Sequence, residues 1–262
     1  MVDFYYKKYG NGIKKIIFFH GFGQNHTAFE KSITQILKES DVTCYAIDIY
    51  YHGKSQRKNR PLQLKQLETS FQQFLETENV KSFTSIGYSL GGRFVLAIST
   101  LFPQATECIF LLAPDGVFQS TWYRLANTRL GNTLFKYLMD RPVVFDQLVN
   151  TFRRIGIVSK PLGRFVETIL NSEQQRTRVY QTWTYFHSLQ MKPKAIASCF
   201  NQYQIPIHVI VGDQDRIIPP QKVLPKLNTI KHLKSVILNA RHHQIITEST
   251  PYIISVLKNP NL

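Results

Sequence analysis

The sequence has few acidic residues, few cysteines and no long apolar run. Its 17 Asp and Glu residues stand against 32 Lys and Arg, which gives a formal net charge of +15. The three cysteines, Cys44, Cys108 and Cys199, are widely spaced, so we expect buried free thiols and neither a disulfide framework nor a zinc site. Because no apolar run approaches the roughly 20 residues that cross a bilayer, we expect no transmembrane segment.

A secretion signal and the usual nucleic-acid-binding motifs are missing as well. Residues 1–8, MVDFYYKK, lack the basic-then-apolar order of a signal peptide, so a cytoplasmic location is the default expectation. We find no zinc finger, no basic helix with heptads and no aromatic RNA-binding consensus, and therefore expect no nucleic-acid partner. The positive charge leaves three explanations open: an anionic small-molecule substrate, a membrane surface, or ordinary solvated lysine-rich faces. Nothing in the sequence indicates the oligomeric state.

What the chain does contain is an alternation of β-prone and helix-prone segments. Its 262 residues, of which 43% are hydrophobic, fit one α/β domain with an insertion. Between residues 116 and 196 the alternation gives way to helical segments with 12 Lys and Arg against 4 Asp and Glu. The predicted organisation is therefore a core of residues 1–115 and 197–262 with a helical insertion at 116–196. Expected strands outside the insertion include residues 16–19, 42–49, 107–112, 207–211 and 235–238, of which 16–19 and 207–211 are expected to be buried.

The predicted insertion is rich in aromatic residues, so we expect it to combine an apolar inner face with a basic outer face. We expect glycine and proline to interrupt its helices. The interruptions fall at Gly131, Pro142, Gly156, Pro161–Gly163 and Pro193. The aromatic residues are Trp122, Tyr123, Phe135, Tyr137, Phe145, Phe152, Phe165, Trp183, Tyr185 and Phe186.

The stretch Phe83–Gly92, FTSIGYSLGG, is the most informative in the chain. It reads as a strand, a sharp turn at one serine, and an apolar helix. Gly87 and Gly91, two residues before and after Ser89, allow strand and helix to approach closely. The turn raises the Ser89 hydroxyl above the sheet edge, at a helix N-terminus whose free N–H groups favour negative charge. Ser89 is therefore the candidate nucleophile.

Four further motifs, in order along the chain, strengthen this interpretation. An apolar run ends in His20-Gly21-Phe22-Gly23, and a loop follows at Asp48-Ile49-Tyr50-Tyr51-His52-Gly53-Lys54-Ser55. Downstream lie Gly212-Asp213-Gln214-Asp215 and Arg241-His242-His243. Together with the strand, turn and helix around Ser89, which we call the elbow, these motifs resemble those of the α/β-hydrolase fold superfamily, in its serine hydrolase branch with a helical lid. Tyr51 departs from the pattern, because glycine is usual there.

The resemblance implies an α/β fold: a mostly parallel central sheet with helices on both faces and an inserted helical lid. It also implies a catalytic triad, because a serine hydroxyl needs an imidazole base and a carboxylate to orient that base. For the acid we prefer Asp215, with Asp213 and Asp115 as alternatives. For the base we prefer His243, because Glu248 follows it by five residues as is usual in the family. His242 is the alternative base.

By resemblance, the backbone N–H groups of Phe22 and Leu90 form the oxyanion hole. Substrate-binding candidates are Tyr88, Gly21, Gly23 and Arg93. We expect no metal and no cofactor. The implied function is a serine hydrolase that cleaves an ester, thioester or related acyl bond of a small-molecule substrate with an apolar part and an anionic group. Two alternatives stay open: an elimination like that of the menaquinone-synthesis branch, with Arg93 holding a carboxylate, and a non-catalytic relative that binds a ligand.

Overall fold

The computed structural model describes residues 3–55, 60–118, 121–154, 170 and 172–259. The chain divides into two compact units. The sheet unit comprises residues 1–57, 63–118 and 189–262, and the helical unit comprises residues 58–62 and 119–188. In the described residues, no helix is long and apolar enough to cross a membrane.

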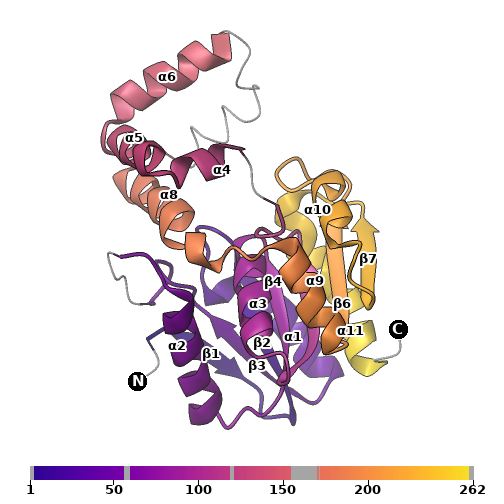
Figure 1. The fold of residues 1–262 in the computed structure, drawn as a ribbon. Helices are drawn as coiled ribbons and strands as arrows, with labels where there is room; N and C mark the ends of the chain where they lie inside the picture. The colour runs from indigo at the N-terminus through magenta and orange to yellow at the C-terminus, as the bar shows by residue number, and fades with distance from the viewer. Residues whose placement is uncertain (1–2, 56–59, 119–120, 155–169, 171, 260–262) are drawn as a thin grey trace. The chain divides into compact units, whose positions relative to one another are not determined.

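A seven-stranded sheet forms the centre of the sheet unit in the described part of the chain (Figure 1). Its strand order is β1-β3-β2-β4-β5-β6-β7, with β1 antiparallel to β3 and all other neighbours parallel. Every residue of β3, β4 and β6 is buried, as expected of parallel strands covered on both faces. The strands are β1 Tyr6–Tyr9, β2 Lys14–Phe19, β3 Val42–Ile47, β4 Phe83–Tyr88, β5 Thr106–Leu112, β6 Ile207–Gly212 and β7 Leu233–Leu238.

Helices cover both faces of this sheet. One face carries α1 (Glu30–Glu39) and α11 (Ile245–Lys258), which pack on each other (Figure 1). The other face carries α2, α3, α9 and α10, whose bounds are Leu64–Thr77, Leu90–Leu101, Pro193–Gln202 and Pro220–Leu227. The expected fold class, a mostly parallel sheet between two helical layers, is confirmed.

Aromatic side chains fill the layer between the sheet and helices α2 and α3. Phe19 of β2 stacks on Phe94 of α3 with ring centroids 6.2 Å apart and an interplanar angle of 13°. Phe71 of α2 meets Phe83 of β4 edge-on at 5.4 Å. All four rings are almost completely buried. Burial of each such ring contributes about 2–3 kcal/mol, so this layer fixes α3 and its N-terminus against the sheet.

The helical unit has a core of its own. It contains the 3-10 turn His187–Leu189 at its boundary and the helices α4 Thr121–Ala126, α5 Arg129–Asp140, α6 Pro142–Arg154 and α8 Glu173–Tyr185. Phe135 of α5 packs against Tyr180 and Trp183 of α8, with ring centroids 5.7 and 5.6 Å apart. The Tyr180 hydroxyl donates to Asn132 Oδ1 at 2.9 Å. These rings pack on one another within the unit, and α4 contacts both α5 and α8, so the three helices form one small bundle.

One expected helix break in this unit is wrong. Gly131 lies in the first turn of α5, where its N–H donates to the capping Thr128 hydroxyl at 3.1 Å. A Cβ at this position would lie 1.9 Å from the Leu125 carbonyl oxygen, so glycine here lets α4 and α5 meet. Pro142 and Pro193 begin α6 and α9, as expected of proline at a first helical position. The expected breaks at Gly156 and Pro161–Gly163, and Phe165, lie outside the described residues.

Candidate active site

Ser89 stands at the turn between β4 and α3 with φ 50° and ψ −116°. This positive φ is unfavourable for a residue with a Cβ, and surrounding hydrogen bonds hold it. The Ser89 N–H donates to the Leu112 carbonyl at 2.9 Å, and the Ser89 carbonyl accepts from the Asp115 N–H at 2.8 Å. The end of β5 and the segment after it therefore fix the strained turn on both sides.

The two glycines around Ser89 are required by close backbone packing. A Cβ on Gly91 would lie 1.9 Å from the Phe19 carbonyl oxygen of β2. A Cβ on Gly87 would lie 2.7 Å from the Gly91 carbonyl oxygen. Both distances are far below van der Waals contact, so any side chain here would push α3 away from the sheet. The structure thus places Ser89, Gly87 and Gly91 as the sequence predicts.

Asp215 lies in the turn after β6, and its side chain is fully buried. Its Oδ1 accepts from the backbone N–H groups of Ile217 and Ile218, both at 2.8 Å. Its Oδ2 lies 2.6 Å from His242 Nδ1. Buried carboxylates need such partners, and two backbone donors plus one imidazole supply them here. Asp213 is exposed in the same turn, whereas the carboxylate that contacts the imidazole is that of Asp215.

His242 connects Asp215 to Ser89. Its Nε2 lies 3.1 Å from Ser89 Oγ while its Nδ1 contacts the carboxylate. A carboxylate can only accept, so Nδ1 carries the proton and Nε2 is free to accept the serine proton. The side chain of His242 is 14% exposed, which leaves this nitrogen shielded but reachable.

The preference for His243 as the base is not supported by this geometry, because His243 is exposed and the structure brings His242 to the serine. The reason is the register of a short 3-10 turn, His242–Gln244, after β7. Gln244 Oε1 accepts from the Arg241 N–H at 2.9 Å, which makes Arg241 the residue before the turn and His242 its first residue. The spacing to Glu248 does not decide this register.

Arg93 and Asp115 are bound to each other. Arg93 Nη2 lies 2.5 Å from Asp115 Oδ2, and the Arg93 side chain is 5% exposed. The other carboxylate oxygen of Asp115 accepts from the Gly116 N–H at 2.7 Å. The structure therefore joins the alternative acid to the arginine proposed for substrate binding, and places neither against His242. The elimination alternative stays a prediction, with Arg93 paired to Asp115 in this structure.

Tyr88 packs against the His242 loop. Its hydroxyl donates to the His242 carbonyl oxygen at 3.0 Å, and the two rings lie 5.1 Å apart. The Tyr88 side chain is buried, and burial together with the nearby Asp215 raises the pKa of its hydroxyl above the usual range. Tyr88 was expected to bind substrate. The hydrogen bond to His242 is a contact that sequence reasoning missed.

The loop that follows β2 carries the predicted oxyanion donor Phe22. Gly21 is buried, Phe22 is half-buried and Gly23 is exposed with φ 75°. Leu90 is the first residue of α3, so its N–H has no partner inside that helix. Gln24 Oε1 accepts from the Gly21 N–H at 2.9 Å, a contact that motif spacing alone does not reveal.

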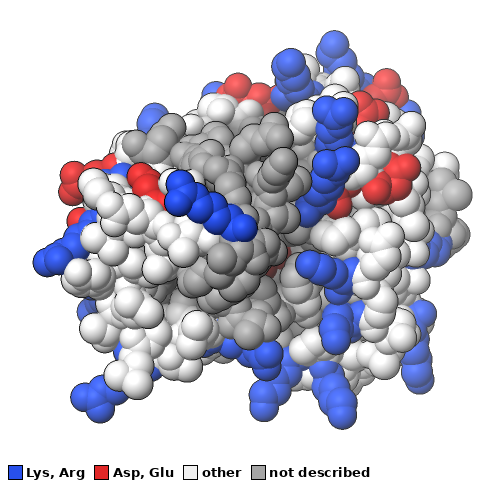
Figure 2. All heavy atoms as spheres, turned by 90° about the horizontal axis from the view of Figure 1, so that it is seen from above, with Lys and Arg blue, Asp and Glu red and all other residues white. Residues whose placement is uncertain are grey.

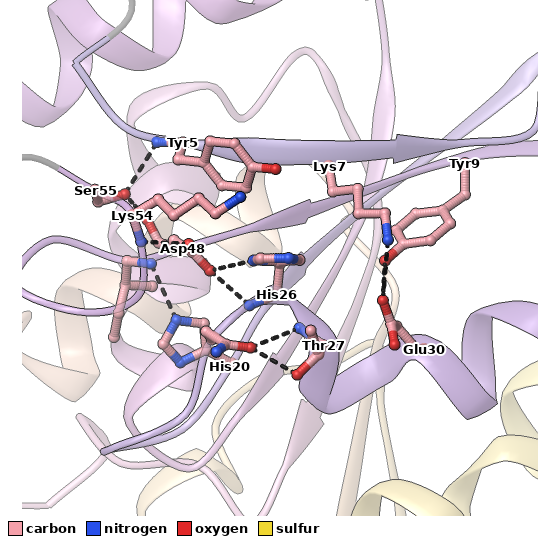
Figure 3. Close-up of polar contacts among 12 residues, drawn as sticks. Tyr5, Lys7, Tyr9, His20, His26, Thr27, Glu30, Asp48, Lys54 and Ser55 are labelled. Atoms are coloured by element: carbon pink, nitrogen blue, oxygen red, sulfur yellow. Dashed lines mark hydrogen bonds and ion pairs between the residues drawn. The ribbon is translucent and has the colours of Figure 1, made fainter.

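Asp48 connects the end of this loop, at His26, to the loop after β3, at Lys54. Figure 3 shows Asp48 between His26 and Lys54, accepting from the His26 N–H at 2.6 Å and from the Lys54 N–H at 2.7 Å. A Cβ on Gly53 would lie 2.1 Å from the same carboxylate. Tyr51, where the family pattern has glycine, has φ 64° and so keeps the glycine-like backbone.

Positive charge is spread over one face of the molecule. On the face shown in Figure 2, Lys and Arg side chains are dispersed and acidic side chains are fewer. Arg216 and Arg241, the sequence neighbours of Asp215 and His242, are both exposed. Among the described residues no group of three His, Cys, Asp or Glu side chains could hold a metal ion.

The order of these motifs corresponds to one family. The family model for the alpha/beta hydrolase fold matches residues 14–249. The chain belongs to this family. It is 23% identical over 253 residues to the pimeloyl-[acyl-carrier protein] methyl ester esterase of Wigglesworthia glossinidia brevipalpis, covering 93% of this chain and 92% of that protein. The expectation of an α/β-hydrolase enzyme is thereby confirmed.

Solved structures of other α/β-hydrolases resemble this one in fold. A thermophilic esterase from Thermogutta terrifontis has a TM-score of 0.70 and 15% identity, covering 97% of this chain and 93% of its own. An enol-lactonase from Burkholderia xenovorans has a TM-score of 0.66 and 16% identity, covering 98% and 96%. At such identities the likeness concerns the fold, so the chemistry must be argued from the residues of this site.

Proposed function

We propose that this α/β-hydrolase is a serine hydrolase that cleaves acyl bonds with Ser89 as nucleophile, His242 as base and Asp215 as acid. The observation that carries the proposal is the continuous contact from carboxylate to serine. His242 lies 2.6 Å from Asp215 Oδ2 through Nδ1 and 3.1 Å from Ser89 Oγ through Nε2. These distances suit a base that is oriented on one side and accepts a proton on the other.

The reaction begins when Ser89 Oγ attacks the carbonyl carbon and passes its proton to His242 Nε2. The carbonyl oxygen becomes an oxyanion, which the backbone N–H groups of Phe22 and Leu90 stabilise. Collapse of this intermediate breaks the bond to the leaving group, which takes the proton from His242 and leaves an acyl-enzyme. Water then gives its proton to His242, attacks the acyl carbon and releases the acid.

The proposed substrates are esters or thioesters with an apolar acyl part and an anionic group. Support comes from the esterases in the comparisons and, for the anionic group, from the exposed Arg216 and Arg241 next to the acid and base. We propose that the segment 116–196 serves as the lid that selects the apolar part. The exposed Leu130 and Leu134 of α5 supply apolar surface for this role.

The two adjacent histidines provide a matched pair of variants. We expect His242→Ala to lower kcat on p-nitrophenyl acyl esters by about 10⁴-fold or more, because the serine loses its base. We expect His243→Ala to stay within about threefold of wild type. Ser89→Ala should lose both hydrolysis and labelling by a fluorophosphonate probe.

A series of esters with increasing acyl length would also show how much apolar surface the site accepts. Equal losses in the two histidine variants would contradict the assigned base. A wild-type protein whose Ser89 reacts with neither ester nor fluorophosphonate would contradict the hydrolase itself and favour a non-catalytic relative.

A further inference from the structure

Gly21 is held at both of its backbone polar groups by side chains of its own loop. Its N–H donates to Gln24 Oε1 at 2.9 Å, and its carbonyl oxygen lies 2.7 Å from His20 Nδ1. The Gln24 N–H also donates to the same carbonyl at 3.3 Å. Gly21 is buried, and buried backbone groups need such partners.

The tautomer of His20 follows from its second contact. The Ile49 N–H can only donate, and it lies 3.2 Å from His20 Nε2. Nε2 is therefore the unprotonated nitrogen, so Nδ1 carries the proton and donates to the Gly21 carbonyl. The ring of His20 is fully buried, and the Ile49 N–H, just after β3, holds it in this orientation.

The Gly21 carbonyl and the Phe22 N–H belong to one planar peptide unit. In a trans peptide these two groups point in opposite directions. The described part of the chain contains no cis peptide bond. A contact that fixes the direction of the Gly21 carbonyl therefore also fixes the direction of the Phe22 N–H.

Other contacts restrain the two ends of this loop but not its middle, so they cannot replace the contacts that hold Gly21. On one side, a Cβ on Gly21 would lie 2.9 Å from the Tyr88 ring, so the backbone already abuts that ring. At the far end of the loop, Asp48 holds the His26 N–H. Gly23, between them, is exposed with nothing within 4 Å of its Cβ position, so it adds no restraint.

We propose that Gln24 and His20 are positioning residues that aim the Phe22 N–H of the oxyanion hole. The inference rests on the proposed function, in which that N–H is one of two donors to the oxyanion. Neither side chain touches the substrate, and both act through the Gly21–Phe22 peptide. Removing a whole donor costs about 10²–10³-fold in kcat, and misaligning one should cost less, about 10–100-fold.

The test compares Gln24 with its neighbour Asn25. Gln24→Met keeps the length of the side chain and removes the acceptor for the Gly21 N–H. Asn25→Ala is the matched control, because Asn25 Oδ1 accepts from Thr27 N–H at 2.9 Å and has no bond to Gly21. For each variant we would measure kcat and KM on a p-nitrophenyl ester, Tm, and the inhibition constant of an alkyl boronic acid, which forms a tetrahedral adduct on Ser89.

We expect Gln24→Met to lower kcat about 10–100-fold with KM within about threefold, and to weaken boronic acid inhibition by a similar factor. Asn25→Ala should lower Tm and leave kcat and boronic acid inhibition close to wild type. The proposal fails if Gln24→Met behaves like Asn25→Ala, or if its kcat falls while boronic acid inhibition is unchanged. A wild-type Ser89 that does not react at all would overturn the proposed function, and this proposal with it.

Discussion

His208 of β6 provides a quantitative prediction of stability against pH. Its side chain is buried, stacks on Phe110 with ring centroids 4.9 Å apart, and has Nδ1 2.8 Å from the Tyr252 hydroxyl. Burial, with a smaller contribution from the charge of Lys234, lowers the pKa of His208 to about 4. The folded protein thus holds this imidazole neutral, whereas in the unfolded chain its pKa is about 6.5.

Because the folded pKa is the lower one, the unfolded state binds more protons as the pH falls. The contribution of His208 to stability is therefore present above about pH 6.5 and is lost as the pH falls toward 4. A difference of about 2.5 pKa units corresponds to about 3 kcal/mol in full. Between pH 7 and pH 5 the loss amounts to about 2 kcal/mol.

Urea unfolding of wild type and His208→Gln at pH 7 and pH 5 would measure this loss. Glutamine does not titrate, so the variant should lose about 2 kcal/mol less than wild type over this interval. Comparing the change with pH cancels any packing effect of the substitution itself. His232→Gln, at an exposed position, is the control and should follow wild type. Equal losses in wild type and His208→Gln would refute the argument that burial keeps His208 neutral.

Two further predictions concern the packing around the nucleophile. Gly91→Ala places a Cβ 1.9 Å from the Phe19 carbonyl oxygen and should destabilise the protein by at least about 2 kcal/mol in urea unfolding. Gly23→Ala, with open space but φ 75°, should cost only about 1 kcal/mol, and equal costs would contradict the packing argument. Tyr88→Phe removes the hydrogen bond to the His242 carbonyl and keeps the ring. We expect kcat to fall about 3–10-fold with less than about 1.5 kcal/mol lost in stability, and an unchanged kcat would show that the hydroxyl does not position the base.

The sequence alone determined the features that depend on local chain chemistry. Apolar β-prone runs specify buried strands, because such runs can bury both faces of a parallel sheet. The glycines around Ser89 specify the elbow, because only glycine permits the approach of α3 to β2 and β4. Tyr51, where the family pattern has glycine, has a positive φ of 64°, a conformation that glycine adopts readily.

Tertiary structure decided which side chains meet. The choice between two adjacent histidines depends on the register of one turn after β7, which the Arg241–Gln244 hydrogen bond sets. Arg93 lies near the nucleophile in sequence, but its partner Asp115 comes from the end of the next strand. Periodicity and spacing describe one segment at a time. Contacts between segments depend on how the strands and helices pack, and that packing brings His242 to Ser89 across 153 residues of chain.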